Sequence, residues 1–90
     1  MYARVKVYGQ EYDAAVEHFV ESVVQREVGF KPVVEFIPES DELMNPEDLL
    51  ARRAVFEVSL SKGVNTENID RMLRHLPITK DVRFKEAEEE

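Results

Sequence analysis

Few side chains in this 90-residue chain are suited to acid–base or metal chemistry. The only histidines are His18 and His75, and there is no cysteine. Glu17 and Glu21 lie close to His18 on an expected helix, but one histidine beside carboxylates is more typical of the polar side of an amphipathic helix than of a metal site. The lack of cysteine excludes thiolate zinc sites, cysteine nucleophiles and disulfides. We therefore predict no metal site and no cofactor.

The hydroxyl groups and the glycines form no catalytic motif either. Gly29 and Gly63 are expected in turns, and no glycine-rich loop is present that could hold a phosphate group. The serines lack neighbours in the sequence that would activate a nucleophile. We predict that the protein is not an enzyme and that it acts by binding. The serines considered are Ser22, Ser40, Ser59 and Ser61.

The net charge of −7 comes from two acidic segments. Residues 38–50 carry five acids and residues 86–90 carry four, and neither segment carries a base. Without these nine acids, the rest of the chain has ten acids against twelve bases. A negative net charge repels phosphate backbones, so non-specific nucleic-acid binding is disfavoured. The two segments are either a solvated loop and tail, or they address a basic partner surface and mimic nucleic acid.

Hydrophobic periodicity predicts four strands and two main helices. Alternating apolar and polar residues between glycines and prolines are typical of half-buried strands. Apolar residues at i, i+3, i+4 and i+7 predict the helices, with Asp13 and Asn65 as N-caps and Gly29 as the left-handed residue that ends the first helix. The expected order is strand 2–8, helix 14–28, strand 33–37, strand 54–61, helix 66–76 and strand 78–85, with a short helix over 46–52.

This order predicts an α+β fold of the ferredoxin-like type. Two β-α-β units of this length form a four-stranded antiparallel sheet with two helices on one face. In that topology the first strand lies between the third and the fourth. We expect a single domain over residues 1–85, with an acidic insertion at 38–53 between the second and third strands and an acidic tail at 86–90.

The sheet face away from the helices is the first candidate binding surface. Aromatic rings beside bases on the first strand are a feature of RNA-binding sheets, but the aromatic motif that such proteins carry on the third strand is absent. Mixed apolar and charged side chains suit a protein–protein contact better, commonly a homodimer. The face is expected to carry Tyr2, Arg4, Lys6 and Tyr8, then Val33, Glu35 and Ile37, then Val55, Glu57 and Ser59, and finally Arg83 and Lys85.

The acidic insertion is the second candidate. It is longer than the two to five residues of a usual hairpin connection, and it combines apolar with acidic side chains. Asn45 and Pro46 favour a helix start, and such a helix could dock into an apolar groove with a basic rim. Alternatively, its leucines cover an edge of the domain's own sheet. The residues expected to make the contact are Leu43, Met44, Glu47, Asp48, Leu49 and Leu50.

One stretch resembles a known family. Residues 5–10 (Val-Lys-Val-Tyr-Gly-Gln), followed by Val16 and by residues 20–26 (Val-Glu-Ser-Val-Val-Gln-Arg), resemble the start of the YbeD-like bacterial family. Its members are small ferredoxin-like domains of unknown function, similar to the regulatory ACT domains. The long insertion and the glutamate-rich tail depart from that family. The resemblance implies a regulatory or binding role and offers no catalytic residues.

We therefore expect a small regulatory module that acts through protein–protein contacts, with itself or with another protein. One alternative is an ACT-like sensor that holds a small molecule at a dimer interface, and another is an acidic nucleic-acid mimic. No apolar run reaches the length of about 20 residues that a membrane helix needs. The N-terminal residues lack the apolar block of a signal peptide, so we expect no membrane partner and a cytoplasmic location.

Overall fold

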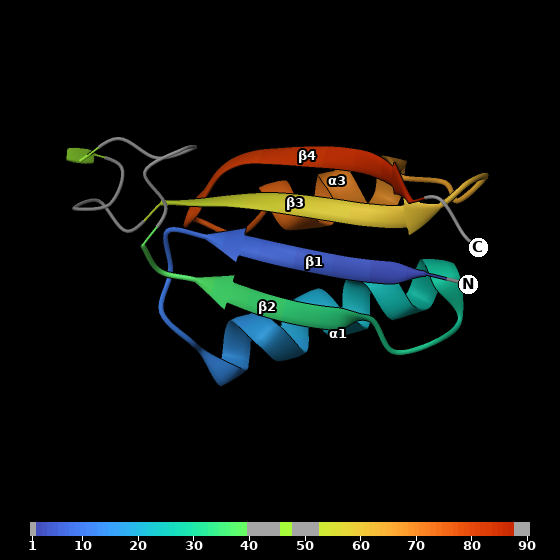
Figure 1. Ribbon diagram of the computed structural model, residues 1–90, viewed down its shortest axis with the longest axis horizontal. Helices are drawn as coiled ribbons and strands as arrows, with labels where there is room; N and C mark the ends of the chain where they lie inside the picture. The colour runs from blue at the N-terminus through green and yellow to red at the C-terminus, as the bar shows by residue number, and fades with distance from the viewer. Residues whose placement is uncertain (1, 40–45, 48–52, 88–90) are drawn as a thin grey trace.

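The helices and strands are arranged as one sheet with both main helices on the same side (Figure 1). The computed structural model describes residues 2–39, 46–47 and 53–87. Within these residues, no helix is long and apolar enough to cross a membrane. The elements are β1 (Ala3–Tyr8), α1 (Ala14–Val28), β2 (Val33–Ile37), β3 (Ala54–Ser61), α3 (Glu67–Arg74) and β4 (Thr79–Ala87).

Helix α1 begins and ends as its capping residues predict. The Asp13 carboxylate accepts hydrogen bonds from the backbone N–H groups of Ala15 (2.8 Å) and Val16 (3.4 Å). Gly29 follows the helix with φ +84°, a left-handed conformation that suits glycine, and its N–H donates to the Gln25 carbonyl at 2.8 Å. The predictions of Asp13 as N-cap and Gly29 as the residue that ends the helix are confirmed. The prediction of Asn65 as the N-cap of α3 is wrong by one residue, since Thr66 is the N-cap, although the Asn65 side chain accepts from the Glu67 N–H.

The strand order is β2-β1-β3-β4, which places β1 and β3 at the centre of the sheet. β1 and β2 are parallel, β3 and β4 are parallel, and β1 and β3 are antiparallel. Each half of the chain is therefore a β-α-β unit whose two strands are direct neighbours. The two halves meet along the β1–β3 pair.

The prediction of an α+β fold, with four strands and two helices on one face, is confirmed. The prediction of an all-antiparallel sheet, with the first strand between the third and fourth, is wrong: β1 lies between β2 and β3. Periodicity shows which face of a strand is buried, but it does not show which strand lies beside it. A helix of the length of α1 lets the chain return either beside β1 or one strand further on, and here it returns beside β1.

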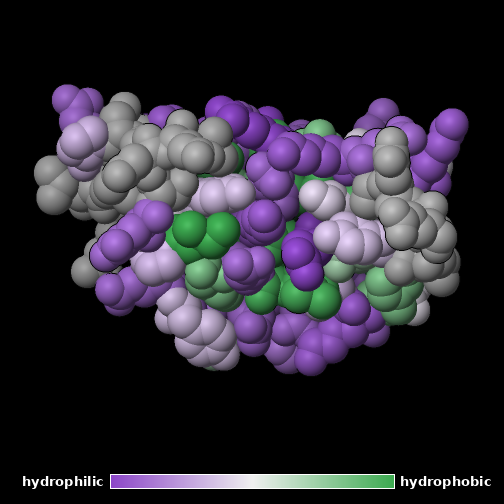
Figure 2. Space-filling view, in the orientation of Figure 1, coloured by the Kyte–Doolittle hydropathy of each residue, from purple (hydrophilic) through white to green (hydrophobic). Residues whose placement is uncertain are grey.

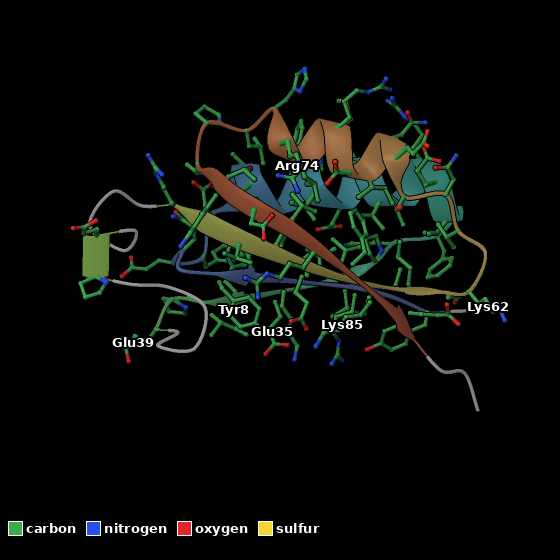
Figure 3. All side chains as sticks on the ribbon, turned by 90° about the horizontal axis from the view of Figure 1, so that it is seen from above. Tyr8, Glu35, Glu39, Lys62, Arg74 and Lys85 are labelled. Carbon is green, nitrogen blue, oxygen red and sulfur yellow. The ribbon has the colours of Figure 1, made fainter. Side chains whose placement is uncertain are left out.

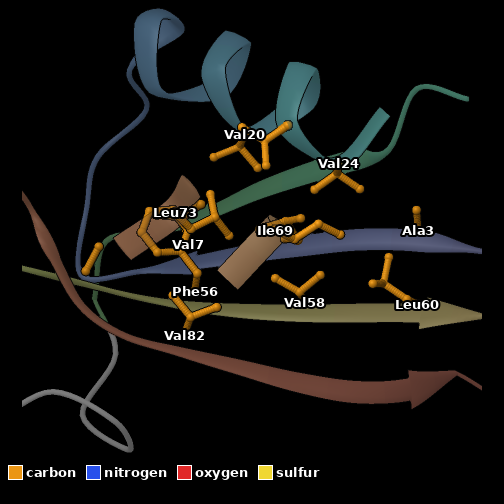
Figure 4. Packing of buried hydrophobic residues seen from close by; sticks show 13 residues of the cluster. Ala3, Val7, Val20, Val24, Phe56, Val58, Leu60, Ile69, Leu73 and Val82 are labelled. Atoms are coloured by element: carbon orange, nitrogen blue, oxygen red, sulfur yellow. The ribbon is translucent and has the colours of Figure 1, made fainter. Parts of the chain in front are cut away.

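The core lies between the sheet and the helices (Figure 4). Val20 and Val24 of α1, with Ile69 and Leu73 of α3, have no exposed surface. They pack on the helix-facing residues of the strands, of which Phe56 is the largest buried side chain. Burial of such side chains stabilises the fold by about 1.5–3 kcal/mol each. The strand residues in this core are Ala3, Val5, Val7, Ala54, Phe56, Val58, Leu60 and Val82.

The acidic insertion does not belong to a hairpin. It joins β2 to β3, and these strands are separated by β1, so the connection must pass the end of that strand. Two strand spacings amount to about 10 Å, which three or four extended residues span. Residues 38–53 are thus more than the sheet needs, although the comparison with hairpin turns does not apply.

Candidate functional site

The sheet face away from the helices, here called the open face, carries a row of alternating charges. Lys6 of β1 lies opposite Glu35 of β2 on one side and Glu57 of β3 on the other. Glu57 in turn lies opposite Arg83 of β4. The row Glu35–Lys6–Glu57–Arg83, here called the charge row, crosses all four strands with signs that alternate from one strand to the next. Hydrophilic residues cover most of this face in Figure 2.

Two of the four charges have ion-pair partners within the chain. Glu57 pairs with Lys85 at 3.5 Å, and the Glu57 side chain is only 12% exposed. Arg83 pairs with Asp81 at 3.3 Å. Among the residues that the structure describes, Lys6 and Glu35 form no ion pair. From the sequence, Glu57 is expected to pair with Arg4 or Lys6 of β1, but its ion pair is with Lys85 of β4.

Arg4 lies on the open face of β1, two residues before Lys6, and Tyr2 directly precedes the strand. The Arg4 guanidinium lies 6.0 Å from the centre of the Tyr2 ring, at the limit of a cation–π contact. The Nε atom of Arg4 is buried and has no hydrogen-bond partner within the described part of the chain. A buried donor without an acceptor is costly, so the position of Arg4 carries an energetic penalty.

The apolar part of the open face is smaller than the sequence predicts. Val55 was expected to be exposed there, but its side chain has 0% exposure. It lies on a central strand, opposite Tyr8 and Asp81 in register, where neighbours on both sides limit access of water. Val33, at 56%, and Tyr2, at 37%, are exposed. Tyr8, Glu35 and Lys85 point away from the helices as predicted (Figure 3).

A network of charged side chains ties α3 to β4. Arg74 pairs with Asp70 at 2.9 Å and with Asp81 at 3.2 Å, and Arg83 contacts the other Asp81 oxygen. Burial raises the pKa of Asp81, but hydrogen bonds from Arg83, from the Val82 N–H and from Arg74 outweigh it, and the pKa of this carboxyl lies below its ordinary value of 3.8. The network is structural, since every group in it already has a partner.

A groove of about 320 Å³ lies between α1 and α3, on the helix side of the molecule. Its floor consists of Phe19, Val23 and Met72, of which Phe19 and Met72 are half-buried and pack against the core. This groove, here called the helix groove, was not predicted from the sequence, because Phe19 and Met72 follow the spacing of core residues. Its remaining lining residues are polar: Ser22, Arg26, Glu27, Asn68 and Arg71.

The polar rim of the helix groove holds two arginines and one engaged carboxylate. Arg71 donates to the Asn68 side-chain oxygen at 2.6 Å, and the Asn68 amide donates to Glu27 at 3.1 Å. In the part of the chain that the structure describes, neither Arg26 nor Arg71 has a carboxylate within ion-pair distance. The groove therefore combines an apolar floor with two guanidinium groups that are open to an anion.

A second hollow, of about 480 Å³, lies where β1 and β2 end. Tyr12 packs edge-on against Phe36, with ring centres 5.5 Å apart, and its hydroxyl donates to Glu17. The charge of Glu17 raises the pKa of Tyr12. Acidic and turn residues line this hollow, including Glu11, Asp13 and Glu39, so it lacks the apolar floor of the helix groove.

Neither histidine is among the residues that line the helix groove. His18 is exposed on α1, and His75 contacts the Arg71 carbonyl at 3.0 Å after the end of α3. Residues 2–39, 46–47 and 53–87 contain no group of three or more acids and histidines that could hold a metal ion. The absence of a metal site remains a prediction for the whole chain.

Most of the predicted contact residues of the insertion lie outside the described residues: Leu43, Met44, Asp48, Leu49 and Leu50. Pro46 and Glu47 are described, and both are helical and exposed. The proposed role of the insertion is therefore not tested by the structure.

Comparisons of this chain with family models, with curated proteins and with solved structures found no match.

Proposed function

We propose that the protein is a binding module that receives an amphipathic helix of a partner protein in the helix groove. The observation that carries this proposal is the pairing of an apolar floor with Arg26 and Arg71, which have no acidic partner in the described part of the chain. The partner helix would bear apolar residues on one face and acids beside them.

The shape of the groove favours a helix over a small molecule. Pockets for small ligands usually have about 300–1,000 Å³ and bury most of the ligand, and this groove, at about 320 Å³, lies at the small end of that range. Helix-in-groove recognition needs a shallow apolar channel that accepts side chains at i, i+3, i+4 and i+7. Two adjacent helices offer such a channel.

The charges of the rim favour an acidic partner. Guanidinium groups bind carboxylates with two parallel hydrogen bonds, which fixes orientation as well as adding energy. Arg26 lies in the last turn of α1 and Arg71 lies on α3, so the two cations flank the floor from different helices. The protein is acidic overall, and this local positive rim would steer acidic segments to the groove.

The proposal is tested with two labelled synthetic peptides of about 18 residues, or five helical turns. Both carry leucine at i, i+3, i+4 and i+7; one has glutamate on both flanks and the other has lysine. Fluorescence anisotropy should show binding of the glutamate peptide only. The double variant Arg26→Glu, Arg71→Glu should reverse the preference, because it inverts the rim.

The control variant is Arg53→Glu, which makes the same change of charge as either of the two replacements, at an exposed position before β3 that does not line the groove. It should bind the glutamate peptide as the wild type does. Equal binding of both peptides, or a preference that the double variant leaves unchanged, would contradict the proposal. Binding of neither peptide would contradict it as well.

A further inference from the structure

We infer that the open face is the contact for a second copy of this chain, in a face-to-face dimer whose two-fold axis runs along the strands between β1 and β3. The inference is independent of the helix groove, which lies on the opposite side of the sheet. It rests on the order of signs in the charge row and on the absence, among the described residues, of ion pairs for Lys6 and Glu35.

The charge row is complementary to itself when it is reversed. From β2 to β4 its signs are negative, positive, negative and positive. A two-fold axis along the strands places β2 over β4 of the second copy and β1 over its β3. Lys6 then faces Glu57 of the second copy, and Glu35 faces its Arg83. All four charges of the charge row in each copy then meet a charge of opposite sign.

The same row disfavours the other face-to-face arrangement. A two-fold axis across the strands at the level of the charge row would place each strand over its own equivalent, so that Lys6 would face Lys6 and Glu35 would face Glu35. Like charges in contact across an interface cost several kcal/mol. The sign order thus selects one of the two axes that could stack the sheets.

Pairing of sheet edges between copies is disfavoured on both sides. β2 carries Glu35 at its middle and is bounded by Pro32 and Pro38, while β4 carries Arg83 and other exposed cations. Charged side chains and prolines on outer strands are the usual protection against edge pairing. The broad face of the sheet remains as the surface on which two copies can meet.

The area of the face predicts a weak and salt-sensitive dimer. Four strands at about 4.8 Å spacing and six residues at about 3.3 Å rise give a face of about 19 by 20 Å. This is well below the roughly 800 Å² per partner of a standard stable interface. Because charges dominate the contact, screening by salt should weaken it. We expect association in the micromolar range or weaker at low salt.

The test is sedimentation equilibrium of the full chain at several concentrations, in about 50 mM and about 1 M salt. The wild type should dimerise at low salt and dissociate at high salt. The variants Lys6→Glu and Glu57→Lys should each weaken the dimer at least about tenfold, since each places two pairs of like charges across the axis. The double variant Lys6→Glu, Glu57→Lys should restore the dimer, because it exchanges the two signs and keeps the row complementary.

Lys62→Glu is the matched control, since it makes the same change of charge as Lys6→Glu in the exposed turn after β3. It should leave the dimer intact. Circular dichroism establishes that each variant is folded. In the double variant, the neighbouring residues 6 and 57 of one chain still have opposite charges. A wild type that stays monomeric at low salt, a dimer that persists in high salt, or a double variant as weak as the single ones would overturn the inference.

Discussion

The two β-α-β halves of this chain reach the same arrangement with different means. The first half has a long helix, α1, with a side-chain cap from Asp13, and a short outer strand, β2, with apolar residues on both faces. The second half has a short helix, α3, without a side-chain bond from its N-cap residue, and a long outer strand, β4, rich in charge. Helix length is therefore not what the shared arrangement depends on.

What the halves share is two fully buried helix residues each. α1 contributes Val20 and Val24, and α3 contributes Ile69 and Leu73. The short helix compensates for its length with larger side chains and with links at its ends. The Asn65 side chain accepts from the Glu67 N–H at 2.9 Å before the helix, and the Thr79 hydroxyl donates to the Leu73 carbonyl at 2.5 Å after it. Such links fix a helix that would be unstable alone at this length.

The largest effect should come from the buried leucine of the short helix. Leu73→Ala should lower the free energy of unfolding by about 2–5 kcal/mol, because it removes fully buried methyl groups and leaves a cavity. Chemical denaturation measures this. If the substitution costs less than 1 kcal/mol, α3 contributes little to the core and the halves differ more than their burial indicates.

A smaller loss is expected for the equivalent position in the long helix. Val20→Ala should cost about 1–3 kcal/mol, since it removes two methyl groups rather than three carbons. Its control is Glu21→Ala, one residue further on, which removes an ion pair with the exposed Lys31. That change should cost no more than about 0.5 kcal/mol. Equal effects of the two substitutions on the denaturation midpoint would contradict the assigned faces of α1.

Removal of the capping side chain should destabilise the first half more than the second. Asp13→Ala should cost about 1 kcal/mol, because the carboxylate accepts from two backbone N–H groups. Asn65→Ala removes one such bond and should cost less. Thermal unfolding of both variants and of the wild type gives the shift of the melting temperature that each substitution causes. A larger shift of the melting temperature for Asn65→Ala would show that the short helix depends more on its cap than the long one.

The smallest effect should be a pH dependence confined to the second half. Hydrogen bonds from Arg83 and its neighbours lower the pKa of Asp81 despite its burial, so its stabilisation is present above pH about 4 and is lost as the pH falls through the folded-state pKa. Asp81→Asn should flatten this part of the stability curve by less than about 1 kcal/mol, since the partners are exposed. Urea denaturation at pH 3 and pH 7 measures the change in the free energy of unfolding between the two pH values. If this change is the same in the variant as in the wild type, other acids cause the pH dependence.

Local chemistry explains which elements the sequence predicts well. The bounds of β2 follow from Pro32 and Pro38, and those of α1 follow from Asp13 and Gly29. These residues act on the backbone beside them, so no knowledge of distant neighbours is needed. The end of β4 at Ala87, beyond the expected residue 85, depends on pairing with Ser61 and was missed.

Features that depend on neighbouring strands could not be predicted in this way. Whether β2 lies beside β1 or beside β3 leaves the alternation of both strands unchanged. The burial of Val55 and the sign order of the charge row follow from the strand order, so they cannot be predicted until the strand order is known. The helix groove was missed for a related reason, since Phe19 and Met72 both contact the core and line a surface.

The separation of β2 from β3 has a consequence for the assembly of the chain. The halves are joined by pairs such as Tyr8 with Val55 and Ala3 with Leu60, so pairing of β1 with β3 closes a loop of about fifty residues. The entropy of closing such a loop grows only with the logarithm of its length, by about 0.6 kcal/mol for each doubling. Shortening residues 38–53 by a dozen would change that closure entropy by only about 0.2 kcal/mol. Thus, as far as loop closure is concerned, the seam between the halves tolerates wide variation in the segment that links them.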